Sequence, residues 1–284
     1  VACVITITVT NPSSGQESPS VNVSATLTDG TSTTSIGAVA QATLTKATGD
    51  IYGISGGLAP LKVVVPAFTQ TGSIQQSTPV AGDTSNVITV TLTSNYRLKT
   101  GTGAAAAKVT ISGLTGTQNS ASPVVTSDTD ASQTNALGTS GDWTQGTGTL
   151  VLTAAADIDS GVQCVITITV TNPSSDQSSP TVNVAATLTD GTSTTSIGTV
   201  AQATLTKATG DKYGISGGLA PLKVVVPTFS TKTIQQSTPV SGASNEMTVT
   251  LTANYALTTG GSSDSKVTIT GLTGSGTAAS AILV

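Results

Sequence analysis

Residues 3–10 read CVITITVT, and residues 164–171 repeat the same letters. In each stretch apolar residues alternate with residues that are mostly threonine. Successive side chains of an extended chain point to opposite faces, so this period of two predicts a β-strand with one buried face. The same alternation returns in further stretches, residues 21–28, 88–93, 109–112 and 149–153. The buried face of the first strand would carry Cys3, Ile5, Ile7 and Val9.

Turn signals separate the predicted strands. Asn11-Pro12 and Asp29-Gly30 are examples, and glycine-rich segments separate other strands. Valine, isoleucine and threonine favour strands, whereas the helix formers Glu, Arg and Met are scarce. Short strands at this spacing are typical of β-sandwich domains. We therefore predict an all-β chain made of tandem Ig-like or jelly-roll-type β-sandwich modules.

The chain also repeats itself, with a period of about 160 residues. Residues 25–66 and 186–227 differ only where Ala38 and Ile51 of the first copy become Thr199 and Lys212. After small deletions in the second copy, equivalent residues lie closer together in the sequence. Examples are Tyr96 with Tyr255 and Lys108 with Lys266. The 284 residues therefore hold less than two copies, and the segment from about Ser127 to Gly161 occurs once.

This repeat predicts four parts. Residues 1–73 form the C-terminal part of one repeat, and residues 74–188 form a complete β-sandwich module. Residues 189–233 form a β-rich insertion or linker, and residues 234–284 form the N-terminal half of the next module. A second division also fits, in which two smaller domains alternate and split near Cys164 and Ile234. The insertion contains strand-like stretches, so we expect it to be folded in either case.

Composition excludes several classes of function. The chain has 10 basic and 14 acidic residues, 8% in total, and no histidine. Without histidine there is no Ser-His-Asp or Cys-His catalytic group and no imidazole metal site. Scarce basic and aromatic residues argue against nucleic-acid binding. No apolar run comes close to the length of about 18 residues that indicates a membrane span. We expect neither an enzyme nor a bound organic cofactor.

Two acidic pairs, Asp128 with Asp130 and Asp157 with Asp159, lie in or beside the segment that occurs once. Alternate carboxylates near backbone carbonyls can ligate Ca²⁺, which takes about six to eight oxygen ligands. These four residues are therefore a candidate Ca²⁺ site. The alternative is that they are solvated loop carboxylates.

Asn22 lies in the sequence Asn22-Val23-Ser24, the only N-glycosylation sequon of the chain. It falls on the polar face of its predicted strand, where an enzyme could reach it. Its counterpart Asn183 lacks the hydroxyl residue, because Ala185 stands in place of the serine. O-glycosylation of exposed threonine and serine is an equally plausible modification.

Each copy has one cysteine at the start of a predicted strand, Cys3 in the first and Cys164 in the second. If the copies stack in a line, the two thiols lie about one module apart. A disulfide needs Cα atoms within about 7 Å, so an intrachain bridge is not expected. We expect buried free thiols, with an intermolecular bridge as the alternative.

Several short motifs occur in a fixed order: IQQSTP (74–79), TVTLT (89–93), KVTISGLTG (108–116), GTLVLT (148–153) and VTNP (170–173). Together they resemble the tandem β-sandwich repeats of very large surface or secreted proteins of microalgae and other protists. The resemblance covers most of each copy outside residues 189–233. It implies display outside the cell, and it implies no known catalysis.

From these observations we predict an extracellular or cell-surface structural protein that forms a filament, stalk or coat. Its partners would be copies of itself, and another chain could complete the strands of residues 234–284. The alternative is an adhesin-type binding module whose loops recognise a glycan or Ca²⁺. Calorimetry with Ca²⁺ and a glycan array would separate the two.

Overall fold

A computed structural model describes residues 3–31, 33–69, 72–130, 132–259 and 264–277. In these residues the regular structure consists of β-strands and two short 3-10 helices, η1 (Gly103–Ala105) and η2 (Gln145–Thr147). The prediction of an all-β chain is confirmed. The chain divides into two compact units, one of Val1–Lys212 with Ser216–Val226 and the other of Tyr213–Ile215 with Pro227–Val284. No helix of the described residues has the length and apolar character needed to cross a membrane.

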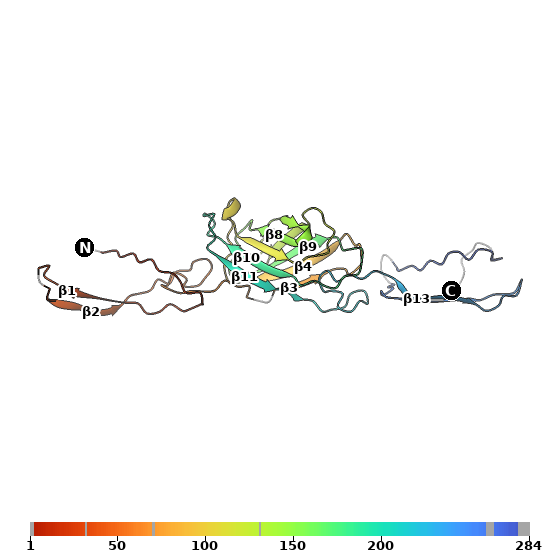
Figure 1. The fold of residues 1–284 in the computed structure, drawn as a ribbon, viewed down its shortest axis with the longest axis horizontal. Helices are drawn as coiled ribbons and strands as arrows, with labels where there is room; N and C mark the ends of the chain where they lie inside the picture. The colour runs from red at the N-terminus through yellow and green to blue at the C-terminus, as the bar shows by residue number, and fades with distance from the viewer. Residues whose placement is uncertain (1–2, 32, 70–71, 131, 260–263, 278–284) are drawn as a thin grey trace. The chain divides into compact units, whose positions relative to one another are not determined.

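The first unit contains a five-stranded sheet with the order β11–β10–β5–β8–β7 (Figure 1). Its neighbouring strands are all antiparallel. The bounds are β5 (Lys108–Ser112), β7 (Asp142–Thr144), β8 (Thr149–Thr153), β10 (Asn183–Leu188) and β11 (Gly198–Thr204). Strand β10 therefore sits between β5, from the first copy, and β11, from residues 189–233.

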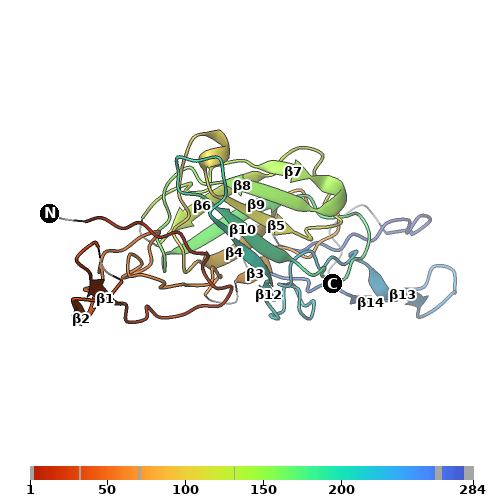
Figure 2. The ribbon, with the colours of Figure 1, turned by 60° about the vertical axis from the view of Figure 1, so that its left-hand side comes forward.

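A second five-stranded sheet of the same unit has the order β12–β3–β4–β9–β6 (Figure 2). All its pairs are antiparallel except the short β12, which is parallel to β3. The bounds are β3 (Ser73–Gln76), β4 (Asn86–Thr93), β6 (Val124–Thr129), β9 (Gln163–Val170) and β12 (Thr206–Lys207). Strand β9 contains residues 164–170 of the repeated stretch and lies between β4 and β6.

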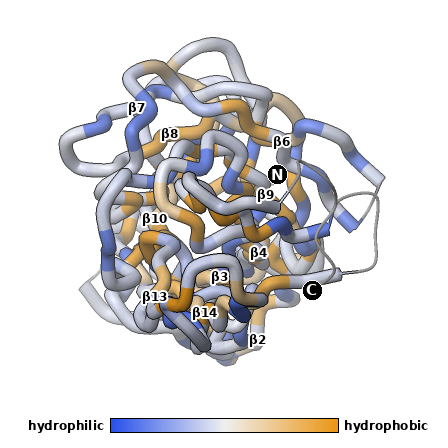
Figure 3. The backbone as a smooth tube through the Cα atoms, turned by 90° about the vertical axis from the view of Figure 1, so that its right-hand side faces the viewer, coloured by the Kyte–Doolittle hydropathy of each residue, from blue (hydrophilic) through white to orange (hydrophobic). Residues whose placement is uncertain are grey.

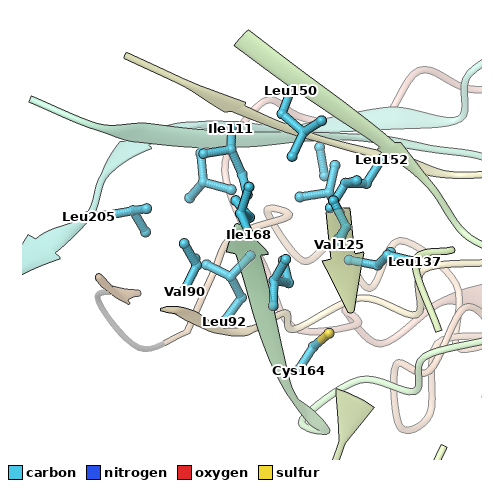
Figure 4. Packing of buried hydrophobic residues seen from close by; sticks show 14 of the residues in the cluster. Val90, Leu92, Ile111, Val125, Leu137, Leu150, Leu152, Cys164, Ile168 and Leu205 are labelled. Atoms are coloured by element: carbon cyan, nitrogen blue, oxygen red, sulfur yellow. The ribbon is translucent and has the colours of Figure 1, made fainter. Parts of the chain in front are cut away.

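The two five-stranded sheets contribute to one hydrophobic core (Figure 4). Ile166 and Ile168 of one sheet and Ile111 and Leu150 of the other are each 0% exposed. Burying one such side chain contributes about 1.5–3 kcal/mol to the free energy of folding. Strand β9 alternates between buried and half-buried residues along its whole length, as its period of two predicts. Hydropathy mapped on the backbone gathers apolar residues near β8, β9 and β10 (Figure 3).

Residues 3–10 have the same sequence as the core of β9, yet they form no strand and are exposed. The prediction of a half-buried strand here is wrong for the chain as described. Strand β9 pairs with β4 and β6, which precede it in the sequence. Within the described residues no strand pairs with residues 3–10, and their apolar side chains are exposed.

The hairpin that follows is nevertheless the same in both copies. Strand β1 (Asn22–Leu27) pairs with β2 (Gly37–Thr43) in the register that joins β10 to β11, and each hairpin has an irregularity at the same place. All residues of β1 are exposed, whereas alternate residues of β10 are buried. The local sequence therefore determines how the two strands of the hairpin pair, and the strands beside the hairpin determine whether its side chains are buried.

The second unit contains one hairpin, β13 (Phe229–Gln236) with β14 (Met247–Ala253). Its pairing repeats that of β3 with β4, so that Ile234 faces Val249 as Ile74 faces Val90. Ile74 is 1% exposed, but Ile234 is 52% exposed. As in the hairpin of β1 with β2, the strands pair as in the central sheets, but their side chains are not buried.

Candidate functional site

Three buried amides form a network at one end of the β3–β4–β9 sheet. Gln76 ends β3, Asn86 begins β4 and Asn172 follows β9. The Asn86 Nδ2 donates to Gln76 Oε1 at 3.0 Å and to Asn172 Oδ1 at 2.7 Å. The Asn172 Nδ2 donates in turn to the carbonyls of Thr78 and Val80. Buried amides are stable only when they are paired in this way.

Sequence analysis did not identify this network, although a signal was present. Gln76, Asn86 and Asn172 each stand two residues from a buried strand residue, on the face that carries apolar side chains. The neighbours on that face are Ile74, Ile88 and Val170. A polar residue at an apolar position of an alternating strand indicates a buried hydrogen-bond network or a binding site.

The network also holds a segment of residues 189–233, which we call the second arm (Ser216–Val226). The backbone N–H of Leu222 donates to Gln76 Oε1 at 2.8 Å. The Gln76 Nε2 donates to the carbonyls of Gly218 at 2.9 Å and Lys223 at 2.7 Å. From the other side, the Gln177 Nε2 donates to the carbonyl of Leu222 at 3.0 Å. Two glutamines therefore bind the backbone of the arm.

Leu222 needs this support because its φ of 53° lies in the left-handed region. That conformation costs a non-glycine residue about 1–3 kcal/mol, and it persists only where the surrounding contacts enforce it. Leu61, its counterpart in the first arm (residues 55–65), has a φ of 56°. Gln16 binds the carbonyl of Leu61 at 2.8 Å, as Gln177 binds Leu222. The arm keeps its conformation in both copies.

A second set of contacts joins residues 52–65 to Tyr96 and Arg97, which follow β4. The N–H of Arg97 donates to the Tyr52 carbonyl at 2.9 Å, and the Tyr96 hydroxyl donates to the Val64 carbonyl at 3.0 Å. Burial raises the pKa of Tyr96 above its usual value. In the second unit the N–H of Ala256 donates to the Tyr213 carbonyl at 2.8 Å. The same backbone contact thus occurs in both copies.

The candidate Ca²⁺ residues Asp157 and Asp159 are paired with cations. Asp157 accepts from the Lys99 Nζ at 2.5 Å and from the Thr100 N–H at 2.8 Å. Burial would raise the pKa of Asp157, but these hydrogen bonds and the Lys99 charge together lower it. Asp159 forms an ion pair with Arg97. Both carboxylates therefore already have partners.

Asp128 and Asp130 lie at the other end of the segment that occurs once. Asp128 accepts from the Asn135 N–H at 3.2 Å, and Asp130 accepts from the Gln163 N–H at 3.1 Å. Across the described ranges, no group of three or more acidic, cysteine or histidine residues is placed to hold a metal ion. Ca²⁺ binding by the four aspartates stays a prediction.

The two cysteines have opposite environments. Cys164 is 3% exposed, and burial, with a smaller effect of the Asp128 charge, raises the pKa of its thiol to about 12. Cys3 is exposed, and both thiols are free. The expectation of a buried free thiol is therefore confirmed for Cys164 and is wrong for Cys3. The reason is that Cys3 lies in residues 3–10, which pair with no strand in the part of the chain that the structure describes.

The sequon residue Asn22 is exposed at the start of β1. Its Oδ1 accepts from the Thr43 hydroxyl at 2.7 Å, and Asn183 accepts from Thr204 in the same way at 2.8 Å. The position is accessible to a modifying enzyme, and use of the sequon stays a prediction.

One shallow depression of about 350 Å³ lies in the first copy. Two of the residues lining it are Lys46 and Lys62. These lysines donate to the carbonyls of Ser18 at 2.6 Å and Ser55 at 2.8 Å. Lys62 also lies 3.8 Å from the Glu17 carboxylate. The depression therefore offers a few polar groups.

Comparison of the chain with protein families, curated proteins and solved structures finds no match. The two copies within the chain provide the comparison that relatives would provide. Residues that bind a partner in one copy identify the residues that would bind it in the other.

Proposed function

We propose that the chain is an extracellular structural repeat protein, in which Ig-like or jelly-roll-type β-sandwich modules follow one another in a surface filament, stalk or coat. The observation that carries the proposal is a backbone contact that occurs in both copies. The N–H of Arg97 donates to the Tyr52 carbonyl in the first unit, and the N–H of Ala256 donates to the Tyr213 carbonyl in the second. Copies with the same local contacts can follow one another in series, so that the number of repeats sets the length of the assembly.

A second pair of contacts also occurs in both copies. The Ala67 N–H donates to Asn95 Oδ1 at 2.8 Å, and the Thr228 N–H donates to Asn254 Oδ1 at 2.8 Å. Each asparagine also donates its backbone N–H to the carbonyl of the residue that it binds. These reciprocal hydrogen bonds hold the backbone at Ala67, which precedes β3, and at Thr228, which precedes β13.

The test of this function is the location and form of the native material. Antibodies against the chain, used in immunogold electron microscopy, should label regular filaments or a coat outside the cell. Labelling confined to the cell interior, or to amorphous material, would contradict the structural role.

The second candidate is an adhesin-type binding module. It is favoured by the depression beside Lys46 and Lys62 and by the acidic residues Asp128 and Asp130. Titration calorimetry with Ca²⁺ and a glycan array test it directly. Saturable binding of either ligand would favour the adhesin, whereas no binding of either would leave the structural role.

A further inference from the structure

We propose that two copies of this chain join head to tail, with residues 3–31 and 33–61 of one copy completing the sheets begun by residues 229–259 and 264–272 of the other. The contacts would be those that the central sheets make within one chain. The proposal rests on the structural role proposed above and deepens it by naming the partner, the segments and the register.

The first argument is the burial of equivalent residues. Ile5 is 75% exposed and its counterpart Ile166 is 0% exposed, while Ile269 is 50% exposed and its counterpart Ile111 is 0% exposed. The same holds for nine further apolar residues of the two end segments: Ile7, Val9, Val23, Leu27, Ile234, Met247, Leu257, Val267 and Leu272. Contiguous exposed apolar residues mark an interaction surface.

The second argument is the register of the central ladder. Strand β9 pairs antiparallel with β4, placing Cys164 opposite Leu92 and Ile166 opposite Val90. Residues 3–10 repeat the sequence of β9, and β14 is the counterpart of β4. The register in the complex is therefore Cys3 opposite Leu251, Ile5 opposite Val249 and Ile7 opposite Met247. Neither residues 3–10 nor β14 carries a charge, so no like charges oppose this pairing.

The third argument is the other sheet. Strand β10 pairs with β5, with Val184 opposite Ile111. The counterparts are Val23 of β1 and Ile269, and both are exposed in the chain as described. The same association therefore adds β1 of one copy beside residues 266–270 of the other.

The fourth argument is the amide network. In the second unit the Asn245 Nδ2 donates to Gln236 Oε1 at 2.9 Å, which reproduces the contact of Asn86 with Gln76. Both residues are exposed there. Their missing partners are the counterparts of Asn172 and Leu222. Asn11 and the Leu61 N–H of a second copy have the residue types and spacing to supply them.

In the central sheets β7 and β8 lie together at one end of their sheet, and β6 lies at the end of the other. The proposed contacts involve none of these three strands, because they reproduce only the ladders between β9 and β4 and between β10 and β5.

The test uses two variants that each lose one half of the interface. Ile5→Asp/Ile7→Asp removes the donating strand, and Val249→Asp/Leu251→Asp removes the accepting one. In sedimentation velocity under reducing conditions the unmodified chain should form oligomers that grow with concentration. Each variant alone should remain monomeric, with affinity lower by about 100-fold or more, because a charge is buried without a partner. An equimolar mixture should form a dimer and nothing larger.

The matched control is Thr6→Asp/Thr8→Asp, which adds the same charges on the opposite face of the strand and should preserve assembly. A second measurement is the rate of Cys3 alkylation, which should fall as oligomers form, because Cys3 then takes the buried position of Cys164. Hydrogen exchange of β4 and β9 should be equal in all variants, which would show that the central sheets are folded.

Three outcomes would overturn the proposal. The first is an unmodified chain that stays monomeric with reactive Cys3, and the second is oligomers that persist in the Ile5→Asp/Ile7→Asp variant. The third is a monomer with protected Cys3, which would mean that the strand folds back within its own chain. None of these bears on the immunogold result, so the head-to-tail contact and the structural role fail separately.

Discussion

At the scale of single residues, Asn86 joins three separate parts of the chain. Its amide binds Gln76 of the neighbouring strand and Asn172 beyond β9, while its Oδ1 accepts from the N–H groups of Ser77 and Thr78. Gln76 in turn binds the Leu222 N–H. Through these amides one buried side chain stabilises both the sheet and the arm.

We expect Asn86→Ala to lower the free energy of unfolding of the central sheets by about 2–3 kcal/mol, because it leaves buried amides without partners. The readout is urea unfolding followed by fluorescence of Trp143, the only tryptophan, which packs against the core. Asn245→Ala, at the exposed counterpart, should change this free energy by less than about 0.5 kcal/mol. Equal effects would show that the amide network does not stabilise the core.

Because of Cys164, the free energy of unfolding should fall as the pH rises above 9. Its pKa of about 12 in the folded state lies above the ordinary thiol value of 9.0. Above pH 9 the unfolded chain loses this proton and the folded chain keeps it, so stability falls by about 1.4 kcal/mol per pH unit until the folded thiol also ionises. Urea unfolding between pH 8 and 11 should show this slope, and Cys164→Ala should reduce it, leaving the contribution of Tyr96, whose pKa burial also raises. An unchanged slope in the variant would contradict the assignment.

At the scale of elements, identical sequences occupy different environments. Gly113 follows β5, where an added Cβ would lie 2.2 Å from the carbonyl oxygen of Thr181. Gly271, its counterpart, also has a positive φ, but nothing lies within 4 Å of its Cβ position. The two glycines therefore separate the cost of backbone strain from the cost of close packing.

We expect Gly113→Ala to destabilise the central sheets by about 3 kcal/mol, through strain and overlap together. Gly271→Ala carries only strain, about 1 kcal/mol, and that strain falls on the second unit. Trp143 fluorescence in urea should respond to the first change and not to the second. A similar response to both would mean that the contact with Thr181 is not made.

The strands illustrate how much the sequence could predict. Alternation is a local property, so it identified the buried face of β9 and the all-β class. It assigned the same burial to residues 3–10, because it contains no information about the neighbouring strand. The pairing of Lys99 with Asp157 was also hidden, since the two residues are distant in sequence. The buried amides were visible as polar residues on apolar faces, and only the structure gives their partners.

At the scale of the whole molecule, stability is concentrated in the two five-stranded sheets. In the Ile5→Asp/Ile7→Asp variant, which keeps the chain monomeric, the amides of β4 and β9 should exchange slowest. Those of β1 and β13 should exchange at least about 100-fold faster, because few buried contacts hold them. Limited proteolysis should release a fragment close to residues 67–226. Equal protection throughout the chain would contradict this distribution.

The strand ladders of the described residues have a further consequence for the conditions under which the protein can work. Among the residues that the structure describes, the ion pairs of Glu17, Asp157 and Asp159 lie outside the strands. Raising ionic strength from 0.01 M to 1 M shortens the Debye length from about 30 Å to about 3 Å, which weakens charge pairs and leaves apolar contacts intact. Contacts among threonine, valine and isoleucine side chains would therefore not weaken when the protein moves from dilute buffer to 1 M salt.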